Sequence, residues 1–309
     1  MESAESFVNE EKKITPLKEG IFTEGTRKLE NATIHFYEFG EGVKLCLIPP
    51  WPMSALTFLP MGETLMKLGF SVTAIDIPGW MGFSELKTVN FSYTFEEYAS
   101  MIQEFIEKHY PNEEKIILAG YSMGGLFALY LMNRLGNKID TVVAMSTPYE
   151  GISIGSTRPV LKKAVATADR FPRLGELLKL GFRYLRLEKM RDLAPSWYVK
   201  KLEKAYQNLD TKGVIRFTKQ FLKMDLTEIL KKLNEKLEQR KPDTPNVVWI
   251  TGDDDSLVLA EKVAKITREI IPEAFFFKIE GMDHNGLVTH PKTLARYLGM
   301  ALTRIDESK

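Results

Sequence analysis

The chain has 309 residues, of which 44% are hydrophobic, so it is long enough and apolar enough to bury a sizeable core. Its 42 Lys and Arg residues balance 41 Asp and Glu residues, which argues against a nucleic-acid partner and against attraction to an anionic membrane surface. The first residues hold no apolar run long enough for a signal peptide. No stretch approaches the roughly 20 apolar residues of a membrane span, so we expect a cytoplasmic protein without an integral membrane segment.

The first predicted elements are two strands, a helix and a third strand. Residues 33–39 and 43–48 have strand composition, and the glycine-flanked turn between them predicts a hairpin-like connection. Residues 56–68 have helical spacing, and residues 70–75 form a short apolar strand. The only cysteine, Cys46, lies in the second strand, where we interpret it as a small buried side chain rather than as a nucleophile.

From residue 95 onward, helix and strand patterns alternate. Residues 95–109 are amphipathic and predict a helix, and the apolar run 115–119 predicts a strand. The same alternation continues through helix 124–135, strand 141–145, strand 247–251, helix 257–270, strand 274–279 and helix 293–304. It predicts the α/β class, with a mostly parallel central sheet flanked by helices on both faces.

One interval interrupts this alternation. About a hundred residues between the strands at 141–145 and 247–251 show no convincing strand pattern and carry apolar residues at helical spacing, punctuated by prolines. We predict that residues 149–243 form an inserted helical cap, or lid, and that residues 1–148 and 244–309 form the core domain. A helical bundle that only adds stability is the alternative.

A serine stands between two glycines where a predicted strand meets a predicted helix. Residues 119–125 read AGYSMGG. At such a sharp turn, a side chain two positions from the serine would collide with the tightened backbone, and Gly120 and Gly124 remove that collision. Ser122 is then exposed at the carboxyl end of the sheet, beside the positive end of the helix that begins near Met123. The pattern predicts that Ser122 is a nucleophile.

With this turn, the sequence resembles the α/β-hydrolase fold superfamily, in particular its capped esterases, lipase-like enzymes and carbon–carbon bond hydrolases. The resemblance extends from about residue 33 to the end of the chain and is strongest in the core. In that family the serine attacks, a histidine activates it, and an acidic residue orients the histidine, in the chain order serine, acid, histidine. The resemblance therefore implies an acid and a histidine beyond Ser122.

Two of the four histidines follow the serine in the chain. His284 lies in the loop after the last predicted strand, and Pro291 follows seven residues later, as a proline commonly does after the family's histidine. We predict that His284 is the general base. His290 adjoins the final helix, where we expect a surface or capping role. His35 and His109 precede the serine, which is the wrong side for the family's chain order.

An acidic triplet follows the predicted strand 247–251, in the segment GDDDSLV. This segment resembles the family's Gly-x-x-Asp-x-x-Val pattern, which implies that Asp255 accepts a hydrogen bond from His284. Asp254 is the first alternative, and Glu150, near the end of an earlier strand, is the second. The cluster lacks the ligand spacing of a zinc or calcium site, so we predict no metal and no cofactor.

Cleavage of an ester or amide by serine develops an alkoxide that needs two backbone donors, which form an oxyanion hole. The resemblance implies the amide of Met123 as one donor and an amide in the loop after an early strand as the other. That loop reads IPPWP at residues 48–52, where the family usually has His-Gly. Proline has no amide hydrogen, so we assign the second donor to Trp51. Three prolines within four residues are also compatible with a cis peptide bond.

A further segment, DIPGWMGFS at residues 76–84, resembles the family's Asp-x-Pro-Gly-x-Gly-x-Ser loop with one extra residue. We expect its role to be architectural rather than catalytic. In this interpretation Asp76 and Ser84 form hydrogen bonds with backbone groups of the turn.

The substrate pocket is predicted to be apolar. The residues on the loops at the catalytic end of the sheet that we expect to line it are Trp51, Met53, Trp80, Met123 and Tyr149. Ordinary core packing is the alternative for each of them. An apolar pocket under a cap suits a small-molecule ester with an uncharged acyl group of small to medium size. The sequence indicates neither the leaving group nor the oligomeric state.

Hydrolysis of a carboxylic ester is the function that these residues favour, with attack by Ser122, an acyl-enzyme, and water activated through His284. The same residues also suit cleavage of a carbon–carbon bond, an amide or an amino-terminal peptide bond. A serine nucleophile argues against dehalogenase and epoxide hydrolase chemistry, which needs an aspartate at that position. The unusual Pro49-Pro50 loop motivates a third hypothesis, a catalytically silent relative that binds a ligand.

Overall fold

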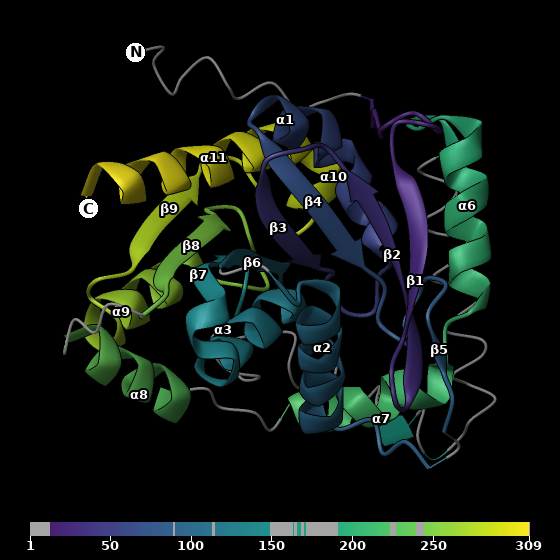
Figure 1. Cartoon of the computed structure of the whole chain (residues 1–309), viewed down its shortest axis with the longest axis horizontal. Helices are drawn as coiled ribbons and strands as arrows, with labels where there is room; N and C mark the ends of the chain where they lie inside the picture. The colour runs from purple at the N-terminus through teal and green to yellow at the C-terminus, as the bar shows by residue number, and fades with distance from the viewer. Residues whose placement is uncertain are drawn as a thin grey trace.

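The computed structural model describes residues 13–88, 90–112, 115–148, 191–222, 227–238 and 244–308, together with residues 163, 166, 167 and 170. A central twisted sheet runs through the molecule (Figure 1). Its strands are β1 (Thr23–Lys28), β2 (Ala32–Phe39), β3 (Val43–Ile48), β4 (Phe70–Ile75), β5 (Glu85–Leu86), β6 (Ile116–Tyr121), β7 (Ile139–Met145), β8 (Asn246–Gly252) and β9 (Phe275–Ile279).

The sheet is mostly parallel, as predicted. Within the described residues it has nine strands in the order β1-β2-β4-β3-β6-β7-β8-β9, and the short β5 also pairs with β2. The strands from β4 to β9 along this order pair in parallel, whereas β1 and β2 are antiparallel to their neighbours. Every residue of β6 is buried, as expected for a parallel strand covered on both faces. The carboxyl ends of the parallel strands therefore meet at one edge.

Helices cover both faces of the sheet (Figure 1). One core cluster lies between the sheet and the helices α2 (Phe95–His109), α3 (Met123–Leu135) and α9 (Ala260–Ile270). A second cluster lies between the opposite face and the 3-10 helix η2 (Ala55–Met61), α1 (Gly62–Lys67), α10 (Gly286–Thr289) and α11 (Pro291–Ser308). A short 3-10 turn, η3 (Gly136–Lys138), leads into β7. Among the described helices, none combines the length and the apolar character needed to cross a bilayer.

Most core elements lie where the sequence predicts them. The bounds of β4 and α2 agree at both ends, and α2 begins at a capping box in which Thr94 and Glu97 each accept a hydrogen bond from the other's backbone amide. The predicted helix 56–68 is divided into η2 and α1, and Pro60 lies within η2. The sequence did not predict β1, because this edge strand is largely exposed and lacks a buried apolar face.

The predicted hairpin between β2 and β3 is wrong. Instead, β4 lies between them, antiparallel to β2 and parallel to β3. Gly40 and Gly42 have φ angles of 76° and 115°, and a Cβ atom on either would collide with the carbonyl oxygen of Phe70 or Gly69. These two glycines therefore allow the connection to pass close to the start of β4. In the sequence, glycines with this purpose look the same as the glycines of a hairpin turn.

Three described helices lie between β7 and β8, in the stretch predicted as a cap. They are α6 (Ser196–Gln207), α7 (Thr211–Phe221) and α8 (Thr227–Glu238). In Figure 1, α6 lies along β1 at one end of the sheet, while α7 and α8 lie below α2 and α3. The described part of 149–243 contains no strand. The division into a core domain (1–148 and 244–309) and a cap domain remains a prediction.

The described helices of this stretch join the core clusters. Tyr198 of α6 is buried, and its hydroxyl donates to the carbonyl of Leu56 at 3.0 Å. Phe217 of α7 is fully buried among the rings of Trp80, Tyr98 and Phe127. The packing of α6 and α7 is therefore continuous with that of the sheet and its helices.

Replacing Phe217 with alanine tests whether α7 is part of this core. Removing the buried ring should lower the free energy of unfolding by about 3–5 kcal/mol, as measured by urea denaturation followed by circular dichroism. Val214→Ala on the same helix removes fewer atoms from a partly buried site and should cost roughly 1 kcal/mol. A loss below about 1 kcal/mol for Phe217→Ala would show that α7 contributes little to the stability of the core.

Candidate active site

Ser122 occupies a strained turn between β6 and α3. Its φ and ψ angles are 52° and −116°, outside the regions that non-glycine residues ordinarily adopt. A Cβ atom on Gly120 would fall on the backbone carbonyl of Gly124, and one on Gly124 would fall on the carbonyl of Ile48. The amide of Ser122 donates to the carbonyl of Met145 at 2.7 Å. The predicted steric role of both glycines is confirmed.

The structure brings the three residues of the predicted triad together. The Oγ atom of Ser122 lies 3.1 Å from Nε2 of His284, and Nδ1 of His284 lies 2.8 Å from Oδ2 of Asp255. The Asp255 side chain is fully buried, whereas 21% of the His284 side chain is exposed. A molecule from solvent can therefore approach the imidazole, while the carboxylate that orients it is shielded from water.

Backbone amides orient the carboxylate of Asp255. Its Oδ1 atom accepts hydrogen bonds from the amides of Leu257 at 3.0 Å and Val258 at 2.8 Å. The second oxygen is thus directed to His284. When Nδ1 of His284 donates to this oxygen, the lone pair of Nε2 faces the Ser122 hydroxyl, which is the tautomer that a general base requires.

The other aspartates of the triplet have different positions. Asp253 joins the acid loop to the histidine loop, since its Oδ1 accepts from the amide of Gly281 at 2.7 Å and its own amide donates to the carbonyl of Ile279 at 3.1 Å. Asp254 is exposed, and the other alternative, Glu150, lies outside the described residues. The geometry therefore favours Asp255 over Asp254 as the partner of His284.

Tyr121 is a site residue that the sequence analysis did not identify. It precedes Ser122, and its hydroxyl donates to the backbone carbonyl of His284 at 3.3 Å. Burial raises the pKa of the Tyr121 phenol far above its usual range, so the hydroxyl stays a donor. This contact joins the histidine loop to the strand that precedes Ser122. In the sequence, the only signal that could have identified Tyr121 as a site residue is its position next to Ser122.

The predicted oxyanion donors belong to neighbouring segments. The Met123 amide is at the start of α3, where helix geometry leaves it without an intrahelical acceptor. The packing of Gly124 against the carbonyls of Ile48 and Pro49 brings the loop after β3 beside this helix. The peptide bond between Trp51 and Pro52 is cis. The roles of Met123 and Trp51 as donors remain predictions.

The residues predicted to line the pocket are dispersed. Trp80 is 2% exposed and packs in the interior against the rings of Tyr98, Phe127 and Phe217, as its core alternative predicts. Met53 is partly buried and packs against a small cluster of Met81, Tyr206 and Leu209. Trp51 is partly buried against the main core cluster, and its Nε1 atom has no partner among the described residues. Tyr149 lies outside the described residues.

The other histidines occupy structural positions. His109 lies between Arg27 at 3.2 Å and Glu38 at 3.1 Å. Of the surface or capping role predicted for His290, the surface position is wrong, because the residue is 4% exposed, and the capping role is confirmed, because His290 caps the end of α10 with its amide donating to the carbonyl of Gly286. His35 contacts Asp76 and is discussed below with the polar network of that residue.

Cys46 is buried and free, and burial raises the pKa of its thiol to about 12. A thiol that stays protonated is a poor nucleophile, so the interpretation as a buried apolar side chain is supported. The described residues contain no group of three or more His, Cys, Asp and Glu side chains able to hold a metal ion.

The fold is that of the α/β hydrolases, and the comparisons agree. The chain matches the family described as "alpha/beta hydrolase fold" over residues 44–291, and it belongs to that family. A relative from Arabidopsis thaliana named "Putative methylesterase 14, chloroplastic" is 25% identical over 82% of this chain and 70% of its own length. Pimeloyl-acyl-carrier-protein methyl ester esterase from Vibrio parahaemolyticus is 25% identical over 46% of this chain and 56% of its own length.

The solved structures support the fold. A bromoperoxidase from Bacillus anthracis superposes with a TM-score of 0.68 and 24% identity, over 91% of this chain and all of that chain. At this level of identity the similarity establishes the architecture, and the chemistry has to be argued from the site itself.

A fluorophosphonate should label Ser122, because the hydrogen bond to His284 activates its hydroxyl. Intact-mass and peptide-mass spectrometry should find one adduct, on the peptide that contains Ser122, and none in Ser122→Ala. Asp255→Asn should slow labelling roughly a thousandfold, since an amide cannot stabilise the imidazolium. The matched Asp254→Asn variant should react within about twofold of the wild-type rate. Equal effects of the two substitutions would contradict the assignment of Asp255.

Proposed function

We propose that the protein is a serine hydrolase that cleaves carboxylic esters through an acyl-enzyme. The observation that carries this proposal is the continuous set of hydrogen bonds from Ser122 through His284 to the buried Asp255. The strained turn at Ser122 supports it, because holding the hydroxyl at a sharp turn costs conformational energy that a purely structural serine would not require.

The proposed reaction starts when Nε2 of His284 takes the Ser122 proton as Oγ attacks the ester carbonyl carbon. The carbonyl oxygen becomes an oxyanion, which the amides of Met123 and Trp51 stabilise. The carbon–oxygen bond to the alcohol then breaks, and His284 returns the proton to the departing alcohol. Water attacks the acyl-enzyme with His284 again as base, which releases a carboxylic acid and restores Ser122.

The proposed substrate is an ester with an uncharged, apolar acyl group and a small alcohol. The partly buried Trp51 and Met53 support an apolar acyl group, because both are apolar residues of the loop beside the turn. The small alcohol is supported by the names of two relatives, a methylesterase and a methyl ester esterase. Carbon–carbon, amide and amino-terminal peptide bonds are the alternative substrates for the same three residues.

A panel of p-nitrophenyl and methyl esters of increasing acyl length tests the proposal. Wild type should hydrolyse the uncharged esters, and Ser122→Ala should lose more than about a thousandfold in kcat while its melting temperature stays nearly unchanged. Activity on amide or diketone substrates with none on esters would instead support the alternative chemistry. A panel without turnover, combined with a ligand-induced thermal shift, would support a silent binding relative.

Two substitutions at Trp51 separate its backbone role from its side-chain role. Trp51→Ala keeps the amide and should mainly alter the preference for acyl length. Trp51→Pro removes the amide hydrogen and should lower kcat about a hundredfold or more, which corresponds to roughly 3 kcal/mol of transition-state stabilisation. A crystal structure of the phosphonate adduct serves as the control for loop distortion. A phosphonate oxygen near Met123 but beyond hydrogen-bond reach of residue 51 would show that the second donor lies elsewhere.

A further inference from the structure

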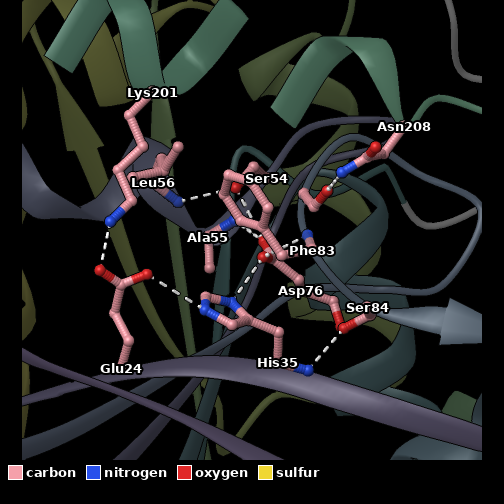
Figure 2. A network of polar contacts seen from close by, with 11 residues as sticks. Glu24, His35, Ser54, Ala55, Leu56, Asp76, Phe83, Ser84, Lys201 and Asn208 are labelled. Carbon is pink, nitrogen blue, oxygen red and sulfur yellow. Dashed lines mark hydrogen bonds and ion pairs between the residues drawn. The ribbon is translucent and has the colours of Figure 1, made fainter. Parts of the chain in front are cut away.

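The carboxylate of Asp76 is fully buried and accepts four hydrogen bonds (Figure 2). Its Oδ1 atom accepts from the Ser54 hydroxyl and from the Ala55 amide, both at 2.7 Å. Its Oδ2 atom accepts from the Phe83 amide at 3.0 Å and faces Nδ1 of His35 at 2.9 Å. A buried carboxylate with charge-assisted bonds to this many donors holds those donors strongly in place.

The residues that donate to Asp76 belong to two loops at the edge of the sheet where the candidate site lies. Ser54 and Ala55 directly follow the Pro49–Met53 loop that contains Trp51, and Phe83 belongs to the segment after β4. The two loops also contact each other, since the Met81 amide donates to the carbonyl of Pro52 at 2.9 Å. One carboxylate therefore fixes both the loop that carries the predicted oxyanion donor and the segment that packs against it.

The same carboxylate leaves no room for a side chain at position 82, which is a glycine. Gly82 has a φ angle of 128°, and a Cβ atom there would collide with the Asp76 carboxylate. The Gly82 amide donates to the carbonyl of Ala205 at 3.1 Å, and the Asn208 side chain donates to the Gly82 carbonyl at 2.6 Å. The loop that Asp76 organises thus also contacts the end of α6.

His35 links Asp76 to Glu24, whose side chain is 40% exposed (Figure 2). Its Nδ1 atom faces Asp76, and its Nε2 atom faces Oε2 of Glu24 at 3.3 Å. Both ring nitrogens of His35 therefore face carboxylate oxygens. The other oxygen of Glu24 pairs with Lys201 of α6. A continuous series of polar contacts therefore runs from Lys201 of α6 through Glu24 and His35 to the buried Asp76.

We propose that Asp76 is a positioning residue that holds the Trp51 amide where the oxyanion forms. This inference rests on the proposed function. One end of the loop is held at the nucleophile turn, where Gly124 packs against the carbonyls of Ile48 and Pro49. Asp76 holds the other end through Ser54 and Ala55. Without that contact this end of the loop loses the hydrogen bonds of Ser54 and Ala55 and is held only by the packing of η2 and the hydrogen bond from Met81 to Pro52, so the Trp51 amide can shift.

Asp76→Asn is the direct test. The isosteric amide presents an N–H group to donors that need an acceptor, so the loop should loosen. With a p-nitrophenyl ester, kcat should fall about tenfold to a hundredfold while KM stays within about threefold, since the loss concerns the transition state. The Met53 amide, which donates to Pro50 across the turn around Trp51, should exchange with deuterium faster, as measured by fragmentation to single residues.

Histidine variants provide a matched control if Asp76→Asn does not fold. His35→Phe removes the donor to Asp76, and His35→Asn keeps a donor near the Nδ1 position, so the asparagine variant should recover most of the kcat that phenylalanine loses. His109→Phe replaces a histidine of similar side-chain exposure, 8% against 9%, that contacts Glu38 instead of Asp76. This control should leave kcat within about twofold.

Three outcomes would overturn the inference. The first is an unchanged kcat in Asp76→Asn, and the second is an unchanged rate of deuterium exchange at the Met53 amide in that variant. The third is an equal loss of kcat in His35→Phe and His109→Phe, because equal losses would indicate a general structural role of buried histidines. A wild-type protein that hydrolyses no ester would count against the proposed function instead. In that case the exchange at Met53 still decides whether Asp76 positions the loop.

Discussion

Close backbone packing at Gly124 is the constraint on which the candidate site depends. There, the start of α3 touches the carbonyls of Ile48 and Pro49 at the end of β3, with no room for a side chain. This approach sets Ser122 at a strained turn and brings the proline-rich loop beside it. The parallel pairing of β3 with β6 supplies the register that makes such an approach possible. The predicted nucleophile and the predicted oxyanion loop are thus both fixed by this one backbone contact.

Two buried carboxylates also shape the site, and they follow β4 and β8, strands that lie on either side of β3 and β6 in the sheet. Asp255 is oriented by two backbone amides and holds His284 against Ser122. Asp76 is oriented by Ser54, Ala55 and Phe83 and holds the loop that contains Trp51. In each case a charge removed from water is compensated by several donors, so that losing one partner leaves a buried group unsatisfied.

The sequence indicated much of the site because its signals are short and local. Ser122 stands out by its two glycines, and the resemblance to the family's segments and chain order then implies Asp255 and His284. Contacts between distant segments gave no such signal. His35 and Asp76 are 41 residues apart, and the insertion of β4 between β2 and β3 is set by tertiary pairing. In the sequence, Trp80 fits a pocket lining and ordinary core packing equally well, and one of the rings that bury it is Phe217, far along the chain.

The central claim, nucleophilic catalysis by Ser122, is tested most directly by trapping the acyl-enzyme during turnover. The protein would be mixed with p-nitrophenyl acetate, quenched with acid within milliseconds to seconds, and digested for mass spectrometry. The account predicts a transient acetyl group on the peptide that contains Ser122, which appears with the burst of p-nitrophenol and decays as substrate is exhausted. Steady hydrolysis with no acetylated Ser122 at any time, or with the acetyl group on another residue, would contradict it.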